Sequence, residues 1–136
     1  MNIVVCVKQV PDTAQDIKLD EQGRLIRKGL ALKTNDWDEY ALEESLLIRE
    51  REGGEVTVIT VGPEKAERVL RDGLAKGADK AVRIWDDSVE ESDSNTIAFL
   101  LSRQIKSMDW DLKTGKPSKE RLIQLGLEDV AKDLWK

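Results

Sequence analysis

The sequence predicts an α/β fold built on a parallel β-sheet, and three observations support this. Three short runs of almost continuously apolar residues occupy positions 2–8, 55–61 and 81–85. Each run is followed by a segment whose apolar residues recur at helical spacing. Turn residues such as glycine and proline separate the segments. This strand–helix alternation is typical of parallel strands joined by right-handed crossovers.

The first predicted strand, at residues 2–8, is apolar on both faces, as expected for a buried strand of a parallel sheet. Pro11 follows it closely, and proline does not continue a central strand. Residues 17–27 then alternate loosely around Glu21, Gln22 and Gly23, which predicts a small hairpin.

The first helix is predicted to begin near residue 35, because Thr34, Asn35 and Asp36 are residue types that cap helices. Its apolar positions recur at helical spacing and are Trp37, Tyr40, Ala41, Leu42, Ser45, Leu46 and Ile48. The glycine pair at residues 53–54 ends it. We expect Trp37 to pack rather than to stack on a base, because the chain's tryptophans are scattered over different elements.

A second helix is predicted after Pro63, which suits the first helical turn. Its inner face is expected to carry Ala66, Val69, Leu70, Gly73 and Leu74. A third helix is predicted at residues 93–106. Residues 113–136 form a tail with short helices predicted before and after Gly126.

Composition narrows the functional classes. The chain is 40 % apolar and 36 % charged with a net charge of −5, which is typical of a globular domain and gives no electrostatic case for nucleic acid. It contains no histidine and one cysteine, which disfavours histidine-based catalysis, most zinc sites and disulfides. The apolar run at the N-terminus has only five residues, so we expect no membrane insertion. We expect a cytoplasmic protein, or an organellar one that has already been processed.

Ligands of parallel sheets bind at the carboxyl ends of the strands, which directs attention to residues 7–9, 60–62 and the segment after Trp85. Neither common glycine-rich phosphate loop is present. Lys8 ends the first strand and is either its solvated tip or a ligand-facing group. Cys6, inside an apolar run, is expected to be a buried structural thiol.

Several collinear segments resemble the N-terminal part of electron transfer flavoprotein β subunits. They are Val4–Thr13, Leu25–Arg27, Tyr40–Glu44, Gly54–Pro63 and Leu70–Ala81. The resemblance covers residues 1–112, which we take as one nucleotide-binding domain, with residues 113–136 as an unassigned helical tail.

The resemblance implies a three-layer sandwich of the adenine-nucleotide-binding, Rossmann-like type, incomplete relative to the family. It implies an electron carrier rather than an enzyme, which works with an α subunit and shared FAD. The domain itself would hold AMP or a second FAD. Electrons would come from acyl-CoA or other dehydrogenases, and the chemistry would belong to the flavin.

The resemblance also implies the positions of the nucleotide contacts. They are Cys6, Asn35, Asp36, Trp37, Asp38 and Val61, flanked by Lys8, Thr60 and Gly62. Several would be main-chain contacts. In the family Asn35 is usually followed by proline, whereas Asp36 stands here and adds a negative charge.

Beyond residue 112 the family's phosphate-wrapping segment and partner-docking arm are not recognisable. The free edge of the first strand is therefore expected to be bare, or covered by the tail or another chain. Two alternatives remain: an adenine-nucleotide-binding module without electron transfer, and a truncated or chimeric product that only folds.

Overall fold

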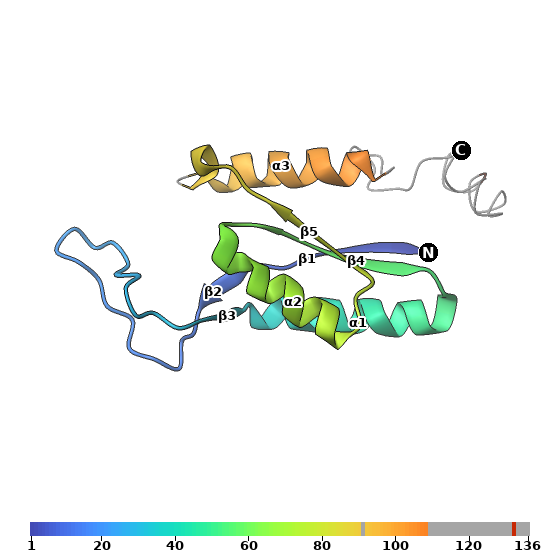
Figure 1. Cartoon of the computed structure of the whole chain (residues 1–136), viewed down its shortest axis with the longest axis horizontal. Coiled ribbons are helices and arrows are strands. Elements are labelled where there is room, and N and C mark those ends of the chain that lie inside the picture. Colours follow the sequence, from blue (N-terminus) through green and yellow to red (C-terminus); the bar gives the residue numbers. More distant parts are fainter. Residues whose placement is uncertain (91, 109–131, 133–136) are drawn as a thin grey trace. The chain divides into compact units, whose positions relative to one another are not determined.

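The computed structural model describes residues 1–90, 92–108 and 132. The chain divides into two compact units, Met1–Glu90 and Glu91–Lys136. In the first unit, β1 (Asn2–Cys6), β4 (Glu55–Val61) and β5 (Lys80–Ile84) form a parallel sheet in the order β1-β4-β5 (Figure 1). The predicted α/β fold with a parallel sheet is confirmed.

Strand β4 is central because it can be buried on both faces. Val56, Val58 and Ile59 have no exposed surface, and the register pairs Cys6 of β1 with Ile59. On the other side Val58 pairs with Ala81 of β5. Strand β1 has β4 as its strand neighbour on one side only, so among the described residues its other edge carries no strand, as predicted.

Helices α1 (Asp36–Glu52) and α2 (Glu67–Lys76) pack on the same face of the sheet, and a short 3₁₀ helix, η1 (Glu64–Ala66), leads into α2 (Figure 1). The core between them and the sheet contains Val5, Val7, Leu42, Leu46, Val56, Val58, Val69, Leu70 and Ala78. Burying these side chains supplies most of the apolar driving force of this unit.

The predicted buried faces of α1 and α2 were partly wrong. Trp37 and Tyr40 are 78 % and 71 % exposed, because the buried face of α1 consists of Leu42, Ser45 and Leu46. Leu74, expected on the inner face of α2, is 42 % exposed. The buried residues of α2 are Val69, Leu70 and Gly73.

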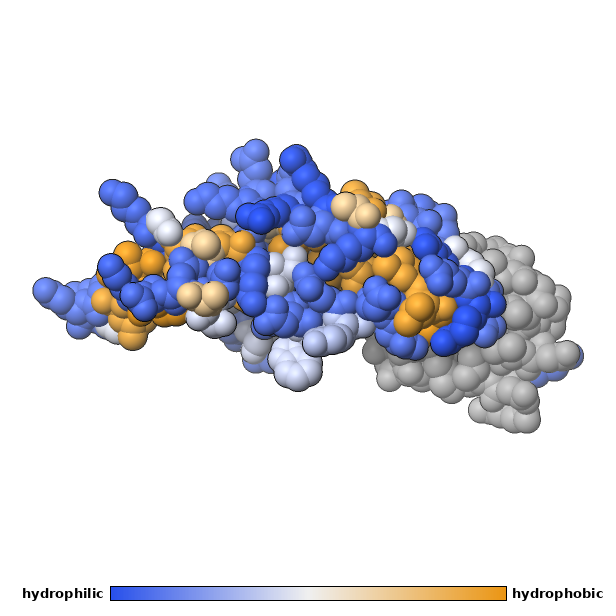
Figure 2. Space-filling model, turned by 90° about the horizontal axis from the view of Figure 1, so that it is seen from below, coloured by the Kyte–Doolittle hydropathy of each residue, from blue (hydrophilic) through white to orange (hydrophobic). Residues whose placement is uncertain are grey.

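Between β1 and α1 the chain forms an arm. Strands β2 (Gln9–Pro11) and β3 (Leu32–Thr34) pair antiparallel at its base. The predicted hairpin lies beyond them and is closed by an isolated bridge between Leu19 and Leu25. The arm extends away from the sheet in Figure 1, and hydrophobic residues gather on it at the left of Figure 2. Its exposed aliphatic residues are Ile17, Leu19 and Ile26.

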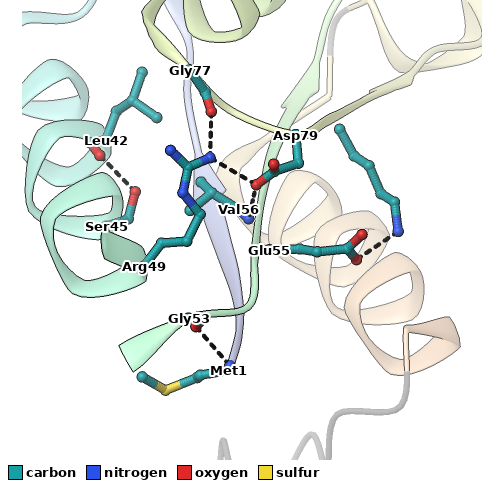
Figure 3. Close-up of polar contacts among 10 residues, drawn as sticks. Met1, Leu42, Ser45, Arg49, Gly53, Glu55, Val56, Gly77 and Asp79 are labelled. Atoms are coloured by element: carbon teal, nitrogen blue, oxygen red, sulfur yellow. Dashed lines mark hydrogen bonds and ion pairs between the residues drawn. The ribbon is translucent and has the colours of Figure 1, made fainter. Parts of the chain in front are cut away.

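A polar brace joins the amino end of the sheet to both helices (Figure 3). Asp79 accepts hydrogen bonds from the Val56 backbone N–H at 2.8 Å and from Arg49 at 3.0 Å. Arg49 also donates to the Gly77 carbonyl at 2.6 Å. The Val56 N–H and the Arg49 guanidinium hold the pKa of Asp79 below its usual range. One carboxylate therefore connects α1, β4 and the turn after α2.

After β5 a 3₁₀ helix, η2 (Asp87–Val89), ends the first unit. In the second unit, α3 (Ser94–Ser107) is capped by Asp93, whose carboxylate accepts a hydrogen bond from the Thr96 N–H at 2.8 Å. The helices predicted in the tail lie outside the described residues, apart from Lys132. In the described part of the chain, no helix is both long enough and apolar enough to cross a membrane.

Candidate functional site

The predicted site residues occupy three segments at one end of the sheet. These are the end of β1, the first turn of α1 and the turn after β4. The Val7 N–H donates to the Ile59 carbonyl at 2.9 Å, which keeps the ends of β1 and β4 side by side. The carboxyl ends of parallel strands are the usual ligand edge of such a sheet, so the arrangement fits the expected location.

Asp38 attaches the first turn of α1 to the end of β1. Its carboxylate accepts a hydrogen bond from the Lys8 backbone N–H at 2.8 Å and one from the Asn35 side-chain amide at 2.9 Å. The Asn35 N–H in turn donates to the Lys8 carbonyl at 3.0 Å. Both carboxylate oxygens are therefore engaged within the chain, and Asp38 builds the site rather than standing free for a ligand.

Cys6 differs from its predicted role, because its side chain is not a buried structural thiol. The residue is exposed, because side chains alternate along a strand and Cys6 faces away from the core that contains Val5 and Val7. The pKa of Cys6 is raised, mainly because the thiol is partly buried and secondarily because the Asp38 carboxylate is nearby. A raised pKa disfavours a reactive thiolate.

The backbone N–H and C=O of Cys6 lie where a ligand can reach them. Val7 directs its N–H to β4, and successive residues of a strand direct their backbone groups to alternate sides. The N–H and C=O of Cys6 therefore point to the free side of β1. A donor and an acceptor are available there for a ligand.

The turn after β4 requires a glycine at position 62. Gly62 is buried, and a Cβ atom there would lie 2.8 Å from the Cβ of Ala66. The Gly62 N–H donates to the Ile84 carbonyl at 3.1 Å, and its carbonyl accepts from Arg83 at 3.3 Å. Gly62 thus lets η1 approach the end of β4 closely. Val61 is half-buried beside it.

Thr60 immediately precedes this turn. Its side chain is 1 % exposed, and among the described residues its hydroxyl is a buried polar group without a hydrogen-bond partner. Such groups are uncommon in folded proteins and call for a structural or functional explanation.

Two predicted site residues direct their side chains elsewhere. Asp36 forms an ion pair with Lys33 at 2.8 Å. Trp37 is exposed, and its ring lies 6.1 Å from that of Tyr40, measured between centroids. Any contribution of these two residues to the site would therefore come from their backbone groups at the helix start.

Sequence reasoning included Gln9 in the strand end at residues 7–9 but did not name it among the contact residues. Its side-chain amide donates to the Lys65 carbonyl at 3.0 Å and so joins the segment after β1 to η1. The available signal was its position directly after Lys8 at the end of the first strand. Gln9 is half-buried, which suits a side chain that bridges two segments.

The polar groups at the strand ends can bind a ligand. Among the described residues, no group of three or more histidine, cysteine, aspartate or glutamate side chains could hold a metal ion. The groups that remain for a ligand are the backbone donor and acceptor of Cys6, the hydroxyl of Thr60 and the start of α1. These suit the polar edges of an organic ligand.

Comparison with known proteins identifies the family of the chain. The family model described as the electron transfer flavoprotein domain matches residues 22–113, which is most of the chain. The chain belongs to this family. The resemblance that the sequence predicted is confirmed.

Named relatives agree with this assignment. Protein FixA of Sinorhizobium fredii is 44 % identical over 105 residues, covering 77 % of this chain and 37 % of that protein. Electron transfer flavoprotein subunit beta of Clostridium acetobutylicum is 42 % identical over 113 residues, covering 82 % and 43 %. The corresponding subunit of Bacillus subtilis is 39 % identical over 116 residues, covering 85 % and 45 %. The chain spans less than half the length of each of these curated relatives.

Proposed function

We propose that the chain acts as a β-type component of an electron transfer flavoprotein, in complex with an α subunit and with FAD. The names of its relatives support this role. Bound flavin would accept and release the electrons, and dehydrogenases, acyl-CoA-dependent or other, would supply them. The chain would position the nucleotide without catalysing a reaction of its own. A cytoplasmic location belongs to the same proposal.

The site at the strand ends fits an adenine nucleotide, AMP or the AMP half of FAD. Adenine presents an amino donor beside ring-nitrogen acceptors, whereas guanine presents a carbonyl acceptor at the same place. The outward C=O and N–H of Cys6 offer the complementary pair. The unpartnered hydroxyl of Thr60 supports the fit from the neighbouring strand.

Charge favours the nucleoside part of the ligand over its phosphate. A helix N-terminus normally attracts anions. The first turn of α1 instead carries three acidic residues, Asp36, Asp38 and Glu39. Lys33 pairs with Asp36 and Lys76 pairs with Glu39, which offsets two of these three negative charges and leaves that of Asp38. The described site would therefore bind adenine and ribose, and phosphate would add little affinity.

A titration of the purified chain tests the site. We expect saturable binding of AMP and adenosine with dissociation constants within about threefold of each other, and GMP binding at least about tenfold weaker. Isothermal titration calorimetry at low and moderate salt provides the measurement. Equal binding of GMP, or no binding of AMP and adenosine, would refute the adenine site. AMP binding without assembly with an α subunit would favour the stand-alone binding module.

A further inference from the structure

We propose that the buried hydroxyl of Thr60 is a ligand-binding group that determines nucleotide affinity at the strand ends. This inference rests on the proposed adenine site and goes further by assigning a specific atom, Thr60 Oγ1. The observation behind it is that this oxygen is enclosed and has no hydrogen-bond partner among the described residues.

The position of Thr60 gives the hydroxyl its direction. Side chains alternate along a strand, so Thr60 shares the face of Val56 and Val58, which pack under the two helices. It lies next to Val7 across the β1–β4 pair, because the register aligns Cys6 with Ile59. The hydroxyl is thus the polar end of an otherwise apolar row, placed where the strand meets the site.

An unpartnered buried hydroxyl is unfavourable for folding, whereas a methyl group of the same shape would be tolerated. Valine has nearly the shape of threonine. The described contacts therefore give no structural reason for a hydroxyl at this position. A hydrogen bond to a bound molecule gives a functional reason for it.

Gln9 lies at the same end of the sheet as Thr60. The Gln9 amide bonds to the Lys65 carbonyl and joins the segments that follow β1 and β4. Gln9 lies two residues beyond Val7, and Lys65 lies three beyond Gly62, so this hydrogen bond closes the same end of the sheet. This hydrogen bond is exposed to solvent, so a nucleotide that binds at this end of the sheet can displace the Gln9 amide.

The test compares Thr60→Val, Thr60→Ser and the control Thr57→Val by calorimetric titration with AMP and by thermal unfolding of the full chain. Thr57 is also buried and lies on β4, but it faces the opposite side of the sheet. We expect Thr60→Val to weaken AMP binding about five- to tenfold while leaving the chain at least as stable. Thr60→Ser and Thr57→Val should bind AMP as the wild type does.

The outcomes separate the two proposals. If the wild type binds AMP and Thr60→Val binds it equally well, the role of the hydroxyl is refuted and the adenine site stands. A loss of binding in Thr60→Ser or Thr57→Val as large as in Thr60→Val also refutes it, because shape or folding would then be responsible. If the wild type binds no AMP, both proposals fail.

Discussion

Replacing Leu42 by alanine is expected to lower the free energy of unfolding by about 2–5 kcal/mol, the usual cost of removing a buried leucine side chain. Leu42 is 3 % exposed and belongs to the core between α1 and the sheet. The residue lies one turn after Asp38, so it also fixes the start of α1 against the strands. Loss of this contact removes apolar burial and leaves a cavity beside β4.

Leu47→Ala is the matched control, because Leu47 lies on the same helix and is 40 % exposed. Its truncation should lower the free energy of unfolding by less than about 1 kcal/mol. Urea unfolding followed by circular dichroism measures both variants. Equal losses for the two leucines would show that the buried face of α1 is assigned incorrectly.

Replacing Gly62 by alanine is expected to destabilise the chain by about 1–3 kcal/mol and to weaken AMP binding, because the added methyl group overpacks the turn. A Cβ atom at position 62 would lie 2.8 Å from that of Ala66. To relieve this contact, η1 must move away from the end of β4. That movement disturbs the segment between Thr60 and Lys65, which borders the site.

The double variant Gly62→Ala with Ala66→Gly tests this cause. Removing the opposing methyl group should restore most of the AMP affinity, although glycine in η1 retains a helix-propensity cost of up to about 1 kcal/mol. Thermal unfolding and calorimetric titration of both variants provide the comparison. If the second substitution rescues neither stability nor binding, the close approach of η1 to β4 is not the reason for glycine at position 62.

The strands of the sheet could be predicted because burial on both faces leaves a clear pattern. The second predicted run, residues 55–61, coincides with β4, the central strand. The helix start at Asn35 was predicted from residue types that favour helix caps, although its side chain bonds to Asp38 instead of capping the backbone. Local sequence signals were sufficient for these elements.

The errors have a tertiary cause. Cys6 is exposed because it lies on the face of β1 opposite the core residues Val5 and Val7, and a run that is apolar on both faces does not indicate which face the helices cover. Trp37 and Tyr40 have the spacing of a helix face, but the sheet contacts the face that carries Leu42 and Leu46 instead. The strands of the β2–β3 ribbon have three residues each, too few for an alternating pattern to be recognised.

The candidate site shows the same contrast between features that local sequence indicates and features that depend on tertiary contacts. Its expected location at the strand ends comes from general rules for parallel sheets, and its expected residues come from the family resemblance. The hydrogen bond from Gln9 to Lys65, and the missing partner of Thr60, depend on how side chains meet across distant segments. Such contacts leave no periodic signal in the sequence.

The most direct test of the proposed electron-carrier function is co-expression of this chain with an electron transfer flavoprotein α subunit from the same organism. We predict that affinity purification of a tagged chain yields a yellow complex of the two proteins. Its FAD, released by denaturation and measured by fluorescence, should amount to about one molecule per pair. A colourless chain that purifies without the α subunit, and without FAD, would contradict the account.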